Sequence, residues 1–392
     1  MGTYNFDKIT ERRGSGALKT DGIEERFGNA SLIPLWVADM DFETPDFIVE
    51  AIRRRAAHPV FGYTMVPDEY WTAIVDWIAI HHSWKVERSW LRYIPGIVKG
   101  IGMAINVFVA QDEKVIIQPP VYHPFRLVPM GNDRQVVYNP LQRDDEGRYH
   151  MDFNNLELVA DEKCRMLLLS NPHNPGGIVW DRDTLECLAD FCYEKGIIVV
   201  SDEIHCDMTL WDNRHIPFAS VSDKASACSI TFGAPSKTFN IAGIVSSYAI
   251  VPDEVLRRKF FTWLLANELD SPDIFAPIAT IAAFTKGEVW RQEMLAYVED
   301  NVDLVIDYCA RYIPRLKPLR PQASFLVWID CRQLGLSHSA LVDLFVRKAR
   351  LALNDGMMFG KEGEGFMRMN VATPRSILQR ALDQLREAVE SI

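Results

Sequence analysis

From about residue 50 to residue 285, short apolar runs alternate with longer segments that have helical periodicity. The run Arg165–Ser170 is almost continuously apolar, as expected for a strand that is covered on both faces of a sheet. The segment Asp181–Lys195 instead repeats apolar residues at helical spacing. Such alternation indicates an α/β fold with a largely parallel sheet. The predicted strands are Lys114–Gln118, Gln135–Tyr138, Arg165–Ser170, Gly196–Ser201, Ser229–Phe232 and Ser246–Val251.

The chain has 392 residues, which is more than one hydrophobic core usually holds, so we expect two domains. In the last third, helical periodicity runs through Glu288–Tyr312, prolines then interrupt the chain, and an apolar run at Ser324–Ile329 follows. A final helix is predicted at Ser376–Ile392. The predicted division is an N-terminal segment (1–49) that packs with the smaller domain, a large domain (50–285), and a smaller α+β domain (286–392).

The composition excludes several classes of protein. The formal net charge is −11 at pH 7, which argues against a nucleic-acid or anionic-membrane partner because both require a basic surface. The longest apolar stretch, Ile101–Ala110, is far shorter than the roughly 20 residues of a membrane span. The polar N-terminus does not resemble a signal peptide, and the seven scattered cysteines form no CxxC pair. These features predict a cytoplasmic protein with reduced thiols.

Polar and aromatic side chains follow four of the predicted strands. Asn174 lies in Asn-Pro-His-Asn-Pro-Gly-Gly, Asp202 begins Asp-Glu-Ile-His, and Lys237 lies in Ala-Pro-Ser-Lys-Thr-Phe-Asn-Ile-Ala-Gly. Tyr122 follows the strand that ends at Gln118. Ligands bind at the carboxyl ends of strands in open α/β sheets, so we expect these side chains to converge.

These residue types suit pyridoxal 5′-phosphate (PLP). A buried lysine such as Lys237 loses its proton more easily and can form a Schiff base with an aldehyde. Asp202 could hold the proton on the ring nitrogen, Asn174 could donate to the ring oxygen, and Tyr122 could stack on the ring. The phosphate requires backbone amides at a helix N-terminus, which Pro95–Gly100 could supply through Gly96, Ile97 and Val98.

Each residue also has an ordinary structural explanation. A lysine after a strand commonly lies on the surface, an aspartate at a strand end caps a helix, and Asn-Pro or Gly-Gly pairs form turns. The functional interpretation depends on the joint occurrence of these residues, in this order, at successive strand ends.

At these positions the sequence resembles the fold type I PLP enzymes of the class I/II aminotransferase superfamily. The resemblance covers nearly the whole chain and includes Gly-Phe-Met-Arg368-Met-Asn-Val-Ala. It implies a mostly parallel seven-stranded sheet with a smaller α+β domain, and a homodimer with shared active sites. It also implies that Lys237 binds the cofactor covalently, that Arg368 clamps the substrate carboxylate, and that Tyr63 reaches the neighbouring subunit's cofactor phosphate.

Within the superfamily, the chain resembles the cystathionine β-lyase/cystalysin-like C–S lyase branch. The similar segments include Pro34–Phe42, which implies a substrate contact at Ala38, and Val60–Thr64. His205 stands where aminotransferases usually have tyrosine, and Val245 stands where they usually have a phosphate-binding arginine. The phosphate must then depend more on backbone amides, Tyr63 and hydroxyls such as Ser236. The residues implied to bind the cofactor are Tyr63, Gly96, Ile97, Val98, Tyr122, Asn174, Asp202, His205, Ser236 and Lys237.

The resemblance implies β-elimination of a thiol from an L-cysteine derivative, with pyruvate and ammonia as products. Lys237 would remove the Cα proton, and Tyr122 is the candidate proton donor near the leaving sulfur. An aminotransferase shares the first step, so the shared residues leave that alternative open. A PLP-binding protein with a regulatory role is a second alternative, which the retained Lys237, Asp202, Asn174 and Arg368 argue against. No metal is expected.

Overall fold

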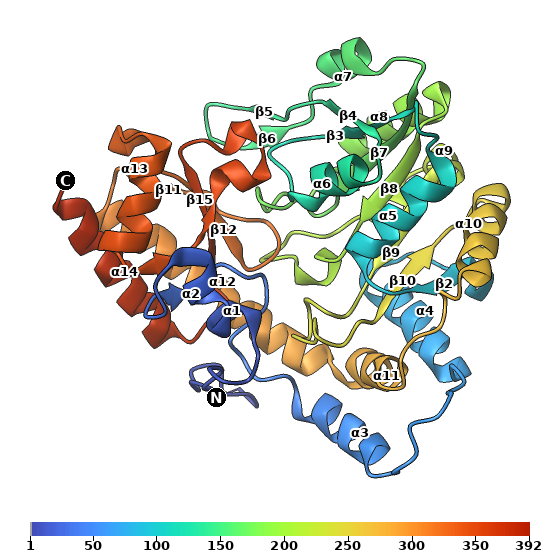
Figure 1. Cartoon of the computed structure of the whole chain (residues 1–392), viewed down its shortest axis with the longest axis horizontal. Helices are drawn as coiled ribbons and strands as arrows, with labels where there is room; N and C mark the ends of the chain where they lie inside the picture. The colour runs from blue at the N-terminus through green and yellow to red at the C-terminus, as the bar shows by residue number, and fades with distance from the viewer. Residues whose placement is uncertain (1) are drawn as a thin grey trace.

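A computed structural model describes residues 2–392 of the chain (Figure 1). Its central feature is a seven-stranded sheet of order β2-β10-β9-β8-β7-β3-β4. Neighbouring strands from β4 to β9 are parallel, whereas β10 is antiparallel to β9 and to β2. The mostly parallel sheet predicted from the sequence is therefore confirmed. The strands are β2 (Leu91–Ile94), β3 (Lys114–Ile117), β4 (Gln135–Tyr138), β7 (Cys164–Ser170), β8 (Ile198–Asp202), β9 (Ser229–Gly233) and β10 (Ser247–Ile250).

Helices cover both faces of this sheet, which explains why its central strands are largely apolar. In β7, Met166 and Leu168 pack into one hydrophobic cluster, whereas Leu167 and Leu169 pack into the cluster on the opposite face. Side chains alternate between faces along a strand, so both sets are buried. One face is covered by α5 (Ile97–Phe108), α6 (Pro124–Gly131) and α10 (Glu254–Ala266), and the other by α7 (Phe153–Val159), α8 (Arg182–Lys195) and α9 (Asp223–Ala227).

Local capping sets the ends of α8 close to the predicted positions. The Asp181 carboxylate accepts a hydrogen bond from the Thr184 amide at 2.7 Å, which satisfies one of the free amides of the first turn. Gly196 ends the helix in the left-handed region at φ +67°. β8 then begins at Ile198 and carries the chain back to the carboxyl edge of the sheet.

The last third of the chain forms a smaller α+β unit. The helix α12 (Glu288–Tyr312) leads into a four-stranded sheet of order β11-β12-β15-β14. The closing helix α14 (Arg375–Glu390) buries Leu378, Ala381, Leu382 and Leu385, one face at helical spacing. The remaining elements are β11 (Lys317–Pro318), β12 (Leu326–Asp330), α13 (His338–Asp343), β13 (Leu351–Ala352), β14 (Asn354–Asp355) and β15 (Phe366–Asn370).

The N-terminal segment lies against the smaller unit, as the blue trace in Figure 1 shows. Its strand β1 (Ile33–Pro34) is parallel to β13, with Ile33 opposite Leu351. The sequence suggested few regular elements there, and the structure has two short helices, α1 (Leu18–Asp21) and α2 (Ile23–Phe27). Domain boundaries at residues 49/50 and 285/286 stay a prediction. The other elements are α3 (Asp46–Ala56), α4 (Asp68–His82), α11 (Ala276–Lys286), and the pair β5 (Gln142–Arg143) and β6 (Tyr149–His150).

The strand register places three strand ends side by side. Ser170 at the end of β7 is opposite Asp202 at the end of β8, and Asp202 is opposite Phe232 of β9. The loops that follow these strands therefore begin at one edge of the sheet, where the carboxyl ends of parallel strands form a ligand-binding crevice. Among residues 2–392, no helix is both long and apolar enough to cross a membrane.

Candidate active site

A cavity of about 540 Å³ lies at this edge of the sheet. Of the residues that the sequence predicts for the site, only Tyr63 does not line it. Its walls come from the loops after the strands, from the N-terminal segment and from the smaller unit. The predicted residues that line the cavity are Ala38, Gly96, Ile97, Val98, Tyr122, Asn174, Asp202, His205, Ser236, Lys237 and Arg368.

Lys237 lies in the loop after β9 and lines the cavity. Its Nζ atom donates a hydrogen bond to the Ala38 carbonyl oxygen at 2.5 Å. Burial lowers the pKa of Lys237 to about 8, because a charged ammonium loses hydration there. A substantial fraction of the lysine is therefore neutral near physiological pH, the state that a nucleophile or a base requires.

Asp202 ends β8 and is buried. Its Oδ1 atom accepts a hydrogen bond from the Ile204 amide at 3.1 Å. Burial raises the pKa of Asp202 to about 7, and the nearby Lys237 charge partly offsets that rise. A carboxylate that is costly to ionise gains from a cationic ligand, and a protonated pyridine nitrogen is such a ligand.

Asn174 and Tyr122 are joined through the backbone. The Asn174 amide donates to the Ser170 hydroxyl at 3.1 Å, and its carbonyl accepts from the Tyr122 amide at 3.1 Å. These bonds fix both residues relative to the end of β7. Burial raises the pKa of Tyr122, so its hydroxyl stays protonated and can donate a proton or a hydrogen bond.

His205 is a buried residue with an unsatisfied ring atom. Its Nδ1 atom has no hydrogen-bond partner within residues 2–392. Burial, together with the charges of Lys237 and Arg368, lowers the pKa of His205 to about 3. The ring is therefore neutral, and it offers one polar atom that a bound ligand could satisfy.

The N-terminus of α5 provides an anion site. Gly96 precedes the helix at φ +112°, a conformation that residues with a Cβ atom rarely adopt, and no side chain caps the first turn. The free amides of Ile97 and Val98, together with the helix dipole, favour a phosphate there. Val245 lies beside Gly96, and Ser236 and Lys99 also line the cavity.

Arg368 reaches the cavity from β15. Its Nη1 atom donates to Asn174 Oδ1 at 2.9 Å, and its Nη2 atom donates to Asn354 Oδ1 at 2.6 Å. Burial lowers the pKa of this guanidinium to about 10, so it remains cationic at neutral pH. Its Nε atom is buried without a partner, and no carboxylate of residues 2–392 forms an ion pair with it. A buried cation in this state is suited to a carboxylate ligand.

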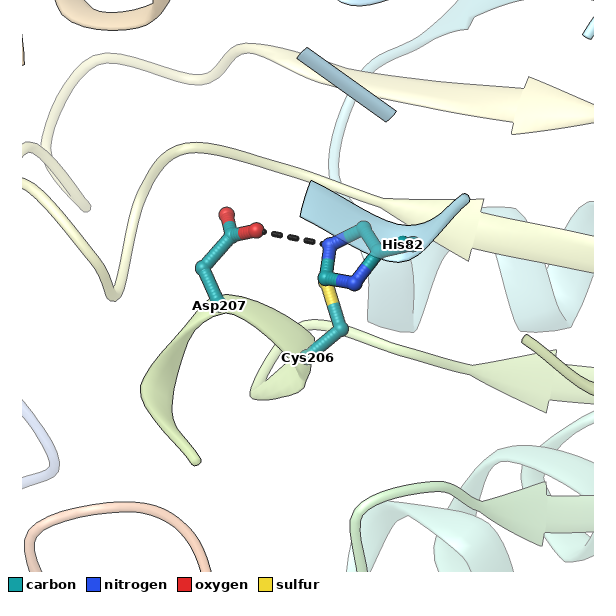
Figure 2. A group of neighbouring side chains, drawn as sticks. All are labelled: His82, Cys206 and Asp207. Carbon is teal, nitrogen blue, oxygen red and sulfur yellow. Dashed lines mark hydrogen bonds and ion pairs between the residues drawn. The ribbon is translucent and has the colours of Figure 1, made fainter. Parts of the chain in front are cut away.

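A second polar cluster contacts the loop that carries Lys237. Figure 2 shows His82, Cys206 and Asp207, with the His82 Nε2 atom 2.9 Å from Asp207 Oδ1. The Thr238 hydroxyl donates to the other carboxylate oxygen at 3.3 Å, and Trp77 Nε1 donates to Oδ1 at 2.8 Å. Asp207 thereby connects α4 with the residue that follows Lys237.

The environment of this cluster suits hydrogen bonding better than metal binding. Burial strongly raises the pKa of the Cys206 thiol, and the neutral thiol is a weak ligand. Burial alone would raise the pKa of Asp207, but the hydrogen bond and charge of His82 outweigh it and lower that pKa to about 2. The carboxylate is therefore ionised and already has donors on both oxygens.

Tyr63 lies outside the cavity, on the connection between α3 and α4. Its side chain is fully exposed, and its neighbours Phe61 and Met65 are exposed as well. Within one chain, Tyr63 therefore contacts none of the predicted cofactor residues. Its predicted role at a neighbouring subunit stays a prediction.

Among the further cavity residues that the sequence did not single out, four come from the segments around α2, α6 and β14. Arg26 lies in α2, His123 directly precedes α6, Asn354 begins β14, and Met358 follows β14. His123 follows Tyr122 in the sequence, and Asn354 contacts Arg368 in the fold. Each of these two could therefore have been found only through a residue that was already predicted.

The comparisons with known proteins agree with this geometry. The model of the family described as "Aminotransferase class I and II" matches residues 30–385. The chain belongs to the class I and II aminotransferase family. This membership confirms the resemblance seen in the sequence, and the fold is that of the type I PLP enzymes.

Three relatives are similar to this family member over nearly their whole length. Cystathionine beta-lyase PatB of Bacillus subtilis is 40% identical, over 98% of this chain and 100% of PatB. The structure of cystalysin from Treponema denticola, which contains a pyridoxal 5′-phosphate cofactor, has a TM-score of 0.95 at 30% identity, over 99% of each chain. The PLP-bound C-S lyase from Staphylococcus hominis has a TM-score of 0.91 at 32% identity, over 98% of each chain.

The cavity of this family member fits PLP. The α5 N-terminus would hold the phosphate, Asp202 would face the ring nitrogen, and Lys237 would attach to the aldehyde carbon. The buried His205 Nδ1 atom and the Arg368 Nε atom are free for a ligand and its substrate. The cavity therefore offers backbone amides for the phosphate, a carboxylate for the ring nitrogen and an amine for the aldehyde carbon.

Proposed function

We propose that the protein is a PLP-dependent carbon–sulfur β-lyase that acts on an L-cysteine derivative. The observation that carries the proposal is the 40% identity with cystathionine beta-lyase PatB over the full length of both chains. The cavity supports it, because Lys237, Asp202, Asn174 and Arg368 all line one space. Bound PLP supplies an electron sink for a carbanion at the substrate Cα atom.

The residues of the cavity have separate roles in this reaction. Arg368 binds the substrate α-carboxylate and thereby orients the Cα–H bond. Lys237, whose pKa burial lowers to about 8, accepts the Cα proton. The Ala38 carbonyl, 2.5 Å from Nζ, holds the amine in place.

Elimination then breaks the bond between Cβ and sulfur. The electron pair leaves with the sulfur, which takes a proton and departs as a thiol. The Tyr122 hydroxyl is the proposed proton donor, since burial keeps it protonated and it lines the cavity. Water hydrolyses the remaining three-carbon unit to pyruvate and ammonia.

The deciding experiment uses purified protein with PLP and L-cystathionine, in the absence of any keto acid. Pyruvate and thiol released in equal amounts, turnover after turnover, support the lyase. An aminotransferase would instead convert the cofactor once to its amine form, release no pyruvate, and recover only after a keto acid is added. That result would contradict the proposal and establish the alternative that the shared first step leaves open.

We also propose a homodimer located in the cytoplasm, in which Tyr63 completes the phosphate site of the partner subunit. The exposed Phe61, Tyr63 and Met65 support this arrangement, because an isolated chain rarely leaves several large apolar side chains together in water. Tyr63 would also supply a hydrogen-bond donor to the cofactor phosphate, which lacks an arginine partner because position 245 holds valine.

Mixing variants tests the shared site. Lys237→Ala and Tyr63→Ala proteins are each expected to be nearly inactive alone. If Tyr63 acts across the interface, a mixed dimer contains one site with both substitutions and one intact site, so activity recovers when the two proteins are refolded together. No recovery in dimers shown to have exchanged subunits would contradict the role of Tyr63.

A further inference from the structure

The outer part of the cavity has features that the elimination reaction does not use. Leu18, Arg26 and Trp36 line it from the N-terminal segment, and His123 and Met358 line it as well. The wall is apolar except for the Arg26 guanidinium and the His123 ring. A small cysteine derivative would react beyond this region, near Lys237, without contacting it.

Arg26 is a cation without a carboxylate partner. It is exposed at the end of α2, and no carboxylate of the described chain lies within ion-pair distance of it. Its Nη2 atom lies 3.4 Å from the Met358 sulfur, which holds it at the rim of the cavity. Glu24 and Glu25 belong to the same short helix but do not line the cavity.

A row of contacts connects Arg26 to the substrate clamp. Arg368 donates to Asn354 Oδ1 at 2.6 Å, and the Asn354 amide nitrogen lies 3.6 Å from the Met358 sulfur. Met358 in turn contacts Arg26. Two guanidinium groups are thus separated along one wall by a single amide and a thioether side chain.

His123 lies near three arginine side chains, those of Arg26, Arg126 and Arg368. Its Nδ1 atom is buried without a partner in residues 2–392. Burial, together with the charges of Arg368, Arg26 and Arg126, lowers the pKa of His123 to about 4. The ring is therefore neutral at physiological pH, and it can donate or accept a hydrogen bond without adding charge.

We propose that Arg26 determines specificity by binding a carboxylate at the far end of the leaving group. The preferred substrates are cysteine S-conjugates with a short apolar linker and a distal carboxylate. The α-carboxylate would bind Arg368, the sulfur would lie near Lys237 and Tyr122, and the linker would pack on Leu18, Trp36 and Met358. This inference rests on the proposed lyase function and adds the substrate class to it.

The test compares two substrates that differ in the distal carboxylate. L-cystathionine has one, on a carbon that also bears an ammonium group, whereas S-ethyl-L-cysteine ends in a methyl group. We expect Arg26→Gln to raise the KM for cystathionine about fivefold, and Arg26→Glu to raise it at least about tenfold, as for an exposed ion pair that is removed or reversed. The KM for S-ethyl-L-cysteine should stay within about twofold in both variants.

A matched control separates the site from the general charge of the protein. Arg347 has a side chain that is 79% exposed and lies on the smaller unit away from the cavity. Arg347→Glu changes the net charge as Arg26→Glu does and should leave both substrates unaffected. Equal changes for both substrates in the Arg26 variants, or no change for cystathionine, would overturn the proposal.

Binding provides a readout that does not require elimination. Substrate addition changes the absorbance of bound PLP, so an apparent Kd can be measured for each substrate and variant. If the wild-type protein binds cystathionine but releases no pyruvate, the lyase function fails while the Arg26 comparison still gives its answer. A Kd for cystathionine that is the same in wild-type and Arg26→Glu protein would refute the distal site in that case too.

Discussion

The floor of the cavity and its cover are built in different ways. The floor consists of Asn174, Asp202 and Lys237, which follow three adjacent strands of a sheet that is buried on both faces. The cover is the segment Val37–Phe42, which passes over Lys237 and contains no strand or helix. The sheet ladder fixes the floor, whereas individual side chains fix the cover.

Two asparagines hold the cover through its carbonyl groups. Asn370 Nδ2 donates to the Val37 and Asp39 carbonyls at 2.7 Å each, on either side of Ala38. Asn240 Nδ2 donates to the Phe42 carbonyl at 2.7 Å. The Ala38 carbonyl that faces Lys237 is therefore positioned by residues distant in sequence.

A group of charged residues reinforces the same segment. Arg12 pairs with Asp39 at 2.7 Å and with Asp41 at 2.9 Å, and Lys19 pairs with Asp41 at 2.9 Å. Lys19 is completely buried, so its charge depends on these partners. The comparison teaches that the chemistry depends on a rigid floor, while its fine geometry depends on a cover that single substitutions can loosen.

The largest effect is expected at the floor, from Lys237→Ala. This change removes both the covalent attachment of PLP and the base that accepts the Cα proton, so turnover should fall at least about a thousandfold. The absorbance band of the attached cofactor should disappear and should not be trapped by borohydride. Lys99→Ala, in which the altered lysine lies at the phosphate end of the cavity, should keep the band. A trapped band in Lys237→Ala protein would show that another residue binds the cofactor.

Asp202→Asn is expected to cost about a hundredfold in kcat, because the amide cannot stabilise a protonated ring nitrogen. Binding of PLP should survive, since the phosphate site and Lys237 are unchanged. The exposed Asp183 on α8 provides a control, and Asp183→Asn should leave kcat unchanged. Near-normal turnover in Asp202→Asn protein would remove Asp202 from its proposed role.

Asp202 also makes the cofactor-free protein sensitive to pH. Its pKa is raised from its usual value near 3.8 to about 7 in the folded chain, so the folded state binds more protons than the unfolded state between these values. The free energy of unfolding should therefore fall as the pH rises from about 4 to about 7. Urea denaturation of Asp202→Asn protein should show a smaller decrease over that range. The same slope in both proteins would contradict the assignment.

The floor could be predicted from the sequence because strand ends are local signals. Strand β4 and helix α12 occupy the predicted residues, and the loops after β7, β8 and β9 carry their polar residues in recognisable order. Helix α5 begins at Ile97 and contains Gly100 and Gly102, which interrupt its apolar pattern. A Cβ atom at Gly100 would lie 2.6 Å from Ile94 Cδ1, so the helix requires glycine to approach the sheet.

The cover could not be predicted in the same way. The contacts of Asn370, Asn240, Arg12 and Lys19 join segments that are far apart in sequence, and no periodicity marks them. Strand β2 was also missed, since its four residues, Leu91–Ile94, lie at an antiparallel edge and resemble a loop. Arg26 and Met358 could be recognised as cavity residues only from the folded structure.

Asn370→Ala tests the cover, with an expected loss of about tenfold in kcat/KM because the Ala38 carbonyl is no longer held against Lys237. The pH at which kcat rises to its plateau should also move, since that limb of the kcat profile reports groups in the substrate complex, where the Lys237 amine acts as the base. Asn301 is a matched control: it is fully buried and donates to the Val371 and Thr373 carbonyls at 2.9 Å, away from the cavity. Asn301→Ala should lose stability without moving the pH limb, and the same shift in both variants would show that Asn370 is merely structural.

The smallest effect is expected from Arg12→Gln, which removes one of two cations beside Asp39 and Asp41. Lys19 stays within 2.9 Å of Asp41, so the cover keeps most of its attachment. The free energy of unfolding should fall by about 1 kcal/mol, as for a partly exposed ion pair, and kcat/KM should change about twofold. Arg13→Gln, at an exposed neighbour whose Nη2 atom bonds only the Ala30 carbonyl among the described residues, should change neither quantity. A loss in Arg12→Gln as large as in Asn370→Ala would mean that charge, rather than the asparagine hydrogen bonds, sets the position of Ala38.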